Sequence, residues 1–355
     1  MRTAMAILVT VVLLAGPVFG GDAAYLPGGE EVKKLVEARR GKTELSKLAA
    51  SMKPGTWAVL PCEVPKGLWS APQPSKGLHI GTWSDDGHWD SRTGQFLYFG
   101  VRQARKFVAY SEETNTWRNI EFHTKENGPE LLQKFGHQYS ANAFDAETSR
   151  YYTNGRRYDL RADTWTVLPP IGGDTQSMTI EFHPGLKGLL NLTKKPAGVV
   201  HLFSEEKQAW SNLGKIAPHG YHSVARENPF RKEVLFAGGN DSAAVAIVQK
   251  DGTLKAMKDF PGGPLTIRFS TCTVDPQSGR YLFMVPERQF YEFDADKNDY
   301  RKIDDFTQTA WPFGSYDSPL VAYIPEHGVS MWADSKVWLY KHDPSVWDSQ
   351  ASEKK

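Results

Sequence analysis

The residues best suited to chemistry in this sequence are histidines, tyrosines and one arginine that occupy equivalent places in a repeating pattern. His137 and Tyr139 lie two residues apart, Tyr221 and His222 are adjacent, and Arg268 follows in a similar setting. An imidazole accepts a proton near neutral pH, a phenol can donate one, and a guanidinium pairs with a carboxylate. These types together would suit β-elimination from an acidic sugar, which needs a base, a proton donor and a neutralised carboxylate.

A second group of residues in the same kind of segment would bind a ligand rather than transform it. This group contains Trp83, His88, His219, Trp311, Tyr316 and Asp317. Aromatic rings such as these can stack on the faces of sugar rings. Half of the ten histidines fall in such segments if His79 is counted, whereas scattered histidines would not favour one place in a repeat.

The repeat that brings these residues together is clearest in residues 151–170. Asn154-Gly155 is a strong hairpin signal between two short strands, Trp165 opens a third strand, and Pro169-Pro170 ends it. Such a unit cannot bury its own faces and needs copies of itself. Six similar units recur at roughly 45 to 60 residues, the period of propeller blades, and each is preceded by a further strand.

The predicted fold is therefore all-β: a six-bladed β-propeller with four-stranded blades. In a propeller the first strand of each blade lines the central channel, and the segments that lead into these strands open on one face. The candidate residues are expected to meet at this central mouth. Other repeated residues are expected to be structural: Trp117, Trp165 and Trp210 as packing anchors, and Asp145, Asp159, Asp275 and Asp294 as turn formers.

Gly238-Gly239, Tyr158-Asp159 and Trp165 resemble the kelch repeat, in which a double glycine closes one strand and an aromatic strand, an acidic turn and a tryptophan follow. The resemblance covers most of residues 80–347, and one of the six units has the full double glycine. It implies a propeller like the central domain of galactose oxidase. A kelch-like fold by itself does not specify a reaction.

The galactose-oxidase resemblance also raises the question of a metal. Tyr221 and His222, together with His137 and Tyr139, are of the types that ligate copper in those oxidases. The enzymes also need a Tyr–Cys cross-link and a histidine from a C-terminal domain. Neither Cys62 nor Cys272 has a clear tyrosine partner, and no such domain is predicted. Zinc is disfavoured because no two histidines have the i, i+4 spacing of a helical site. We therefore expect no metal and no cofactor.

The sequence predicts four parts: a signal peptide (1–20), an N-terminal helical segment (21–55), the propeller (56–347) and a C-terminal tail (348–355). Gly41 is expected to break the helical segment into two helices. The strand around Trp57 copies the strand around Trp165 and is predicted to complete the last blade. The alternative is that Trp347 supplies this strand.

Charge and targeting exclude two classes of partner. The net charge of +1 argues against a nucleic-acid binder, which needs clustered Lys and Arg. The apolar run of the leader is too short for a confident transmembrane span, so we expect no integral membrane segment after its removal, and a secreted or periplasmic protein. Cys62 and Cys272 could pair in an oxidising compartment or remain as buried thiols.

The sequence thus predicts an exported propeller that binds a ligand, either a carbohydrate or a protein, at its central mouth. The alternative is a polysaccharide lyase that acts on a uronate-containing glycan. In that enzyme a histidine and a tyrosine would act as base and acid, and Arg268 would neutralise the carboxylate.

Overall fold

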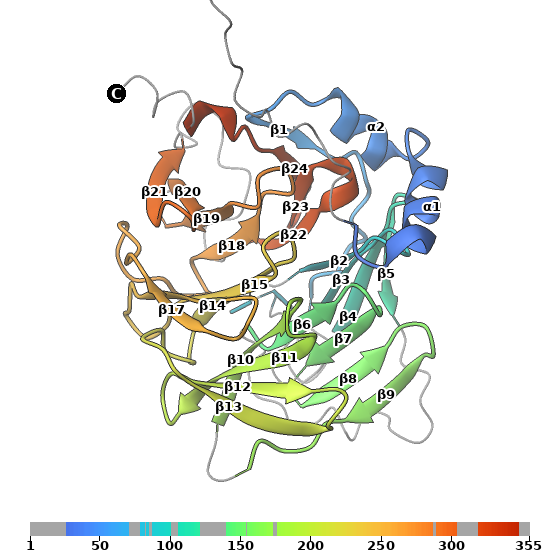
Figure 1. Ribbon diagram of the computed structural model, residues 1–355. Helices are drawn as coiled ribbons and strands as arrows, with labels where there is room; N and C mark the ends of the chain where they lie inside the picture. Colours follow the sequence, from blue (N-terminus) through green and yellow to red (C-terminus); the bar gives the residue numbers. More distant parts are fainter. Residues whose placement is uncertain are drawn as a thin grey trace, which may run out of the picture.

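The computed structural model describes residues 26–70, 79–81, 83–84, 87–100, 106–120, 140–153, 155–172, 176–286, 289–303 and 319–347. These residues form six four-stranded antiparallel sheets that follow one another around a ring in chain order (Figure 1). The predicted six-bladed propeller is confirmed.

Each blade runs from its innermost strand outward, and neighbouring strands in a blade are antiparallel. Blade 1 consists of β2 (His88–Asp90), β3 (Gln95–Gly100), β4 (Lys106–Ser111) and β5 (Thr116–Ile120). Blade 2 consists of β6 (Asn142–Asp145), β7 (Arg150–Thr153), β8 (Arg156–Asp159) and β9 (Thr164–Val167). Blade 3 consists of β10 (Gln176–His183), β11 (Gly188–Lys195), β12 (Val199–Ser204) and β13 (Ala209–Lys215).

Blade 4 consists of β14 (Ser223–Asn228), β15 (Glu233–Gly238), β16 (Val245–Val248) and β17 (Leu254–Met257). Blade 5 consists of β18 (Thr271–Val274), β19 (Tyr281–Val285), β20 (Gln289–Asp294) and β21 (Asp299–Ile303). Blade 6 combines β22 (Leu320–Ile324), β23 (Val329–Ala333) and β24 (Val337–Lys341) with β1 (Thr56–Val59), and the 3-10 turn η2 (Pro325–His327) joins β22 to β23.

The ring is closed by a strand from the N-terminal part of the chain. β1 pairs with β24, with Trp57 opposite Tyr340, and the ring of Trp57 lies 4.6 Å from that of Tyr340. The prediction that Trp57 completes the last blade is confirmed, and the alternative with Trp347 is wrong. Trp347 instead packs beneath Arg280 and Lys297, at 5.4 and 5.0 Å, beside blade 5.

The predicted packing anchors recur at one register of the blade. An aromatic residue of the third strand faces one of the fourth strand, with ring centroids 4.5 to 5.5 Å apart. These pairs are Tyr110–Trp117, Tyr158–Trp165, Phe203–Trp210 and Phe293–Tyr300. The four predicted turn-forming aspartates, Asp145, Asp159, Asp275 and Asp294, each accept a backbone N–H two or three residues further on. Side-chain types at fixed offsets therefore build each blade.

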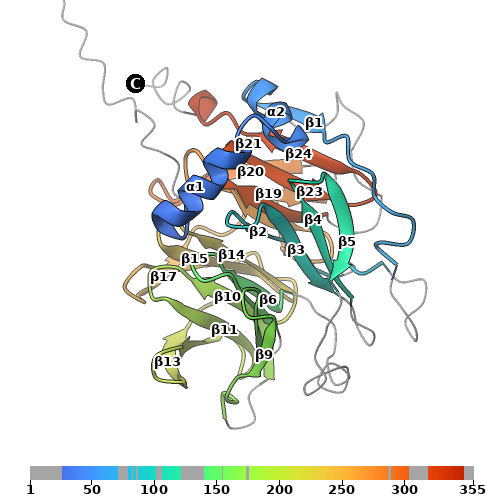
Figure 2. The same ribbon diagram turned by 90° about the vertical axis from the view of Figure 1, so that its right-hand side faces the viewer.

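Two helices precede the first strand, as predicted, and Gly41 lies between them with φ +69°. They are α1 (Gly29–Arg39) and α2 (Glu44–Ser51), and the Thr43 hydroxyl caps α2 by accepting the Ser46 N–H. α2 lies beside β1 in both views of the ring (Figures 1 and 2). Leu45 packs into the core that blades 6 and 1 share. The helices therefore cover the joint where the ring closes.

Cys62 and Cys272 are separate thiols, which resolves the two alternatives against a disulfide. No helix within the described ranges is long and apolar enough to cross a membrane.

Candidate functional site

Four of the sequence-predicted site residues lie in contact at the mouth of the propeller. The Tyr221 and His222 rings stack at 3.7 Å, and the Trp83 ring lies 4.8 Å from His222. The Arg268 guanidinium carbon lies 5.0 Å from the centre of the Trp83 ring, within the range of a cation–π contact. Three leading segments, those before β2, β14 and β18, therefore converge.

Two further side chains extend this cluster. Lys194 holds its ammonium 4.1 Å from the centre of the Tyr221 ring. Phe269, which is 47% exposed, has its ring centre 5.0 Å from the Arg268 guanidinium carbon. Lys194 comes from the end of β11, the second strand of blade 3. Because β11 is antiparallel to β10, its end lies on the same face as the segment leading into β10.

The contact between Trp83 and His222 crosses the channel. In a ring of six blades, blade 1 is opposite blade 4, yet Trp83 of the first touches His222 of the second. Arg226 of β14 makes a second link in the same direction, since its Nη1 donates to the Gly87 carbonyl oxygen at 3.3 Å. The segment leading into β2 therefore reaches over the channel axis, and the cluster lies over the centre of the ring.

Both residues in this contact adopt a backbone conformation that non-glycine residues rarely use. Trp83 has φ +61° and His222 has φ +65°, in the left-handed region. The Ile267 N–H donates to the His222 carbonyl oxygen at 3.1 Å, which holds the strained residue to the next blade's leading segment. Strained residues that are fixed by their surroundings cluster at functional sites, so this pair favours a site here.

Hydrogen bonds with His219 and Thr179 fix the backbone next to Tyr221 and His222. The Tyr221 N–H donates to Nδ1 of His219 at 3.2 Å, and the Thr179 hydroxyl donates to the Gly220 carbonyl oxygen at 3.3 Å. A Cβ on Gly220 would come within 2.3 Å of the Thr193 backbone, so no other residue fits there without a shift. His219 thus orients the pair through the backbone.

The cluster is electropositive, and His222 is neutral at pH 7. Burial lowers the pKa of His222, the charges of Lys194 and His219 lower it further, and a hydrogen bond with Asn240 opposes them. A neutral imidazole can accept a proton or a hydrogen bond. Lys194 and Arg268 supply the fixed positive charge at pH 7.

The other sequence-predicted residues lie elsewhere or outside the described residues. His88 does not belong to the cluster: it is the first residue of β2, 3% exposed, with its ring against Phe144 and Tyr151. Burial and the charge of Arg226 hold the pKa of His88 well below its usual value. The predicted residues outside the described part of the chain are His137, Tyr139, Trp311, Tyr316 and Asp317.

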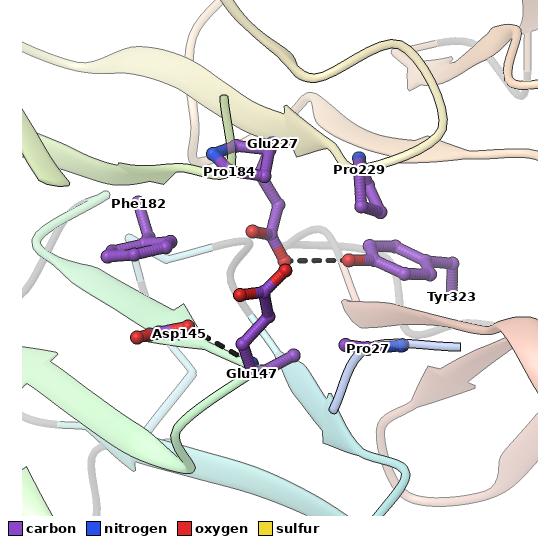
Figure 3. A pocket seen from close by; sticks show the side chains of 9 residues that line it. Pro27, Asp145, Glu147, Phe182, Pro184, Glu227, Pro229 and Tyr323 are labelled. Carbon is purple, nitrogen blue, oxygen red and sulfur yellow. Dashed lines mark hydrogen bonds between the residues drawn. The ribbon is translucent and has the colours of Figure 1, made fainter. Parts of the chain in front are cut away.

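A small acidic cavity lies at the other end of the inner strands (Figure 3). Glu227 and Glu147 face each other across it, and the Tyr323 hydroxyl donates to Glu227 at 2.7 Å. Glu227 is five residues beyond His222 along β14, which places it about 17 Å from the mouth at the usual rise per residue. The cavity measures about 10 Å³, room for one water molecule, so it cannot hold a sugar.

A third polar group lies beneath the helices. Among the described residues, Glu112, Glu326 and His327 are close enough to share a cation. Arg39 already donates to Glu112 at 3.1 Å, and the Trp89 indole N–H donates to Glu326 at 2.8 Å. These partners satisfy the carboxylates, so this group fastens α1 to blades 1 and 6.

Comparison of the sequence with protein-family models and with curated proteins finds no match. Comparison with solved structures finds similar chains. One is a protein of unknown function from Bacteroides thetaiotaomicron, 10% identical, with 82% of this chain and 73% of that chain covered and a TM-score of 0.51. Another is a fungal alcohol oxidase of the AA5 family in complex with copper, 8% identical, with 75% of each chain covered and a TM-score of 0.46. At 10% identity the likeness to the Bacteroides thetaiotaomicron protein concerns the fold alone.

Proposed function

We propose that the protein binds an acidic carbohydrate at the mouth of the propeller. The observation that carries the proposal is the contact of Arg268 with Trp83, which joins a guanidinium and an indole in one partly exposed patch. A guanidinium pairs with a carboxylate through two parallel hydrogen bonds, and indole and phenyl rings offer flat apolar surface. A uronate presents both complementary features, a carboxylate and a sugar face.

The test is a calorimetric titration of the protein with oligogalacturonates and with neutral malto-oligosaccharides of equal length. We expect binding of the acidic series alone. Arg268→Ala removes a charge-assisted contact worth about 1.5 kcal/mol, so affinity should fall slightly more than tenfold. Arg268→Lys keeps the charge but loses the bidentate geometry. Its affinity should lie between those of the wild type and Arg268→Ala.

Lys302 offers a matched control, because it lies near the end of β21, the outermost strand of the same blade, and is exposed. Lys302→Ala should bind as the wild type does. Equal affinity for acidic and neutral sugars, or an unchanged affinity in Arg268→Ala, would count against the proposal. Binding of an acidic peptide such as polyglutamate in place of every acidic sugar would point to a protein ligand.

A second candidate function is favoured by the neutral His222 beside Tyr221. In β-elimination a base removes the C5 proton of a uronate, the C4–O bond breaks, and the leaving oxygen takes a proton, which leaves a C4=C5 double bond. His222 could take the first proton and Tyr221 supply the second, while Arg268 neutralises the carboxylate. His137 and Tyr139 remain candidates for the same two roles.

This second candidate is tested by the ultraviolet absorbance of unsaturated products on a panel of uronate polysaccharides. A lyase should produce this absorbance, and His222→Ala or His137→Ala should abolish it. A flat trace across the panel, with binding retained, would leave the protein a binding propeller.

A further inference from the structure

The members of the mouth cluster are linked by a series of successive contacts. Successive members are Lys194, Tyr221, His222, Trp83 and Arg268, with spacings of 4.1, 3.7, 4.8 and 5.0 Å. We call these five side chains the aromatic row. It has a cation at each end and three rings between them.

The two cations come from different blades. Lys194 belongs to blade 3 and Arg268 to blade 5, so they flank blade 4, which supplies Tyr221 and His222. The four spacings place the two cations at most about 18 Å apart, measured along the row. Each cation is fixed on the ring at its own end of the row by a cation–π contact. The two positive charges therefore contact different rings of the cluster.

From this arrangement we propose that the site takes a chain bearing at least two acidic groups, an oligouronate, with Lys194 and Arg268 as separate carboxylate subsites. The inference rests on the proposed function. A single acidic sugar would occupy one subsite, whereas a chain lies along the rings and reaches both. Two tethered contacts bind more tightly than either alone, because the second forms at a high effective concentration.

The aromatic row offers a bound sugar chain the faces of three rings. The cavity at the far end of the channel has room only for a water molecule, so a sugar chain would bind at the mouth and not there. Aromatic surfaces tolerate small shifts of a stacked ring, while the cations at the ends fix its register. Phe269, which is exposed and lies 5.0 Å from the Arg268 guanidinium, would add one more ring to this surface.

The experiment measures the affinities of galacturonic acid and of its α-1,4-linked dimer, trimer and tetramer by calorimetry. Affinity should rise by about tenfold from the monomer to the length that spans the row, and then level off. Lys194→Ala should weaken the longer ligands by about fivefold and leave the monomer at the Arg268 subsite unchanged. Arg268→Ala should weaken every length.

Lys215 provides the control for Lys194, because it ends the outermost strand of the same blade on the same face. Lys215→Ala should reproduce the wild-type length dependence. Equal affinities for monomer and tetramer, or a Lys194→Ala effect of the same size at every length, would overturn the two-subsite inference while the proposed function stands. Absence of binding at every length would overturn both.

Discussion

Replacing His222 by glycine and by alanine separates what its side chain does for the site from what its backbone costs the fold. His222 has φ +65°, and its carbonyl oxygen accepts the Ile267 N–H at 3.1 Å. Either substitution keeps this backbone hydrogen bond and removes the ring that lies between Tyr221 and Trp83. The two variants differ in whether the left-handed conformation remains strained.

The magnitudes follow from three effects. A non-glycine residue in the left-handed region costs about 1 to 2 kcal/mol, which glycine recovers. Glycine in turn loses about 0.5 to 1 kcal/mol through the greater freedom of its unfolded chain. Both variants lose a ring contact worth about 1 kcal/mol. His222→Gly should therefore unfold within about 1 kcal/mol of the wild type, and His222→Ala should be less stable than His222→Gly by about 1 kcal/mol.

Denaturant unfolding measures the stabilities, and in a domain of this size the difference corresponds to about 2 °C in Tm. Calorimetry with the galacturonate trimer measures the site, where both variants should lose about tenfold in affinity because the row is interrupted. Stability and affinity therefore respond differently to the same pair of substitutions.

Lys232 is the matched control: it lies in the turn between β14 and β15 of the same blade, with φ +56°, at the far end of β14 from the mouth. Lys232→Gly and Lys232→Ala should show the same order of stability and the wild-type affinity. The reasoning is refuted if His222→Ala is as stable as His222→Gly, or if either variant keeps the full affinity.

Three further predictions concern charged groups. Affinity for an oligouronate should rise between pH 7.5 and 5.5, because His222, whose pKa is lowered, gains a positive charge only on acidification; His222→Gln should flatten this dependence in the same titrations. Burial and Arg226 hold the pKa of His88 well below that of the unfolded chain, so between about pH 6.5 and 5 the unfolded state binds a proton that the folded state does not. Stability should thus fall on acidification by up to about 1.4 kcal/mol per pH unit, and His88→Gln should reduce that slope in denaturation measured at several pH values. Arg39→Ala leaves the fully buried Glu112 without its guanidinium partner and should cost about 3 kcal/mol of unfolding free energy, whereas Arg40→Ala at an exposed neighbour should cost little.

The fold could be predicted from the sequence because every blade is built from local signals that recur. The Asn154-Gly155 hairpin, the turn aspartates and the tryptophan at one register each act within a few residues. The strand that closes the ring could also be predicted, because the sequence around Trp57 copies that around Trp165, in the fourth strand of blade 2. Its partner β24 lies far along the chain, but ring closure leaves few other places for it.

The site could be predicted only in part, because its contacts are not local. Equivalent positions in the repeat placed Trp83, Tyr221, His222 and Arg268 at the same mouth of the propeller. Their contacts with one another, however, depend on a segment of blade 1 that crosses the channel. Lys194 was missed because it ends a second strand. Antiparallel pairing of β10 and β11 would have shown that this end also reaches the mouth.

His88 shows where a prediction from equivalent positions in a repeat fails. The repeat placed it in the segment before β2, but β2 begins at His88 itself, which pairs opposite Leu97. Since side chains of a strand point alternately to its two faces, a shift of one residue in the start of a strand changes what a side chain contacts. Here the ring enters the packing between blades 1 and 2.

Closure of the ring and geometry of the mouth are linked through blade 1. Trp83 approaches His222 from a segment whose neighbour is blade 6, where Gly87 N–H donates to the Val321 carbonyl oxygen at 3.2 Å. Blade 6 is complete only when β1 is paired, and Trp57 packs 5.4 Å from Trp332 within it. Loosening β1 should therefore move Trp83 relative to His222.

Trp57→Ala tests this link. The substitution removes a partly buried ring and should cost about 2 to 3 kcal/mol of unfolding free energy, which is less than full burial would give. If the link holds, the affinity of Trp57→Ala for the galacturonate trimer should also fall, although Trp57 lies on the outermost strand of its blade and the mouth cluster lies over the channel. Val59→Ala, at a 45% exposed position of the same strand, should change neither quantity much. A destabilised Trp57→Ala with wild-type affinity under folding conditions would mean that the leading segment of blade 1 is held in place independently of ring closure, by contacts such as that between Arg226 and Gly87.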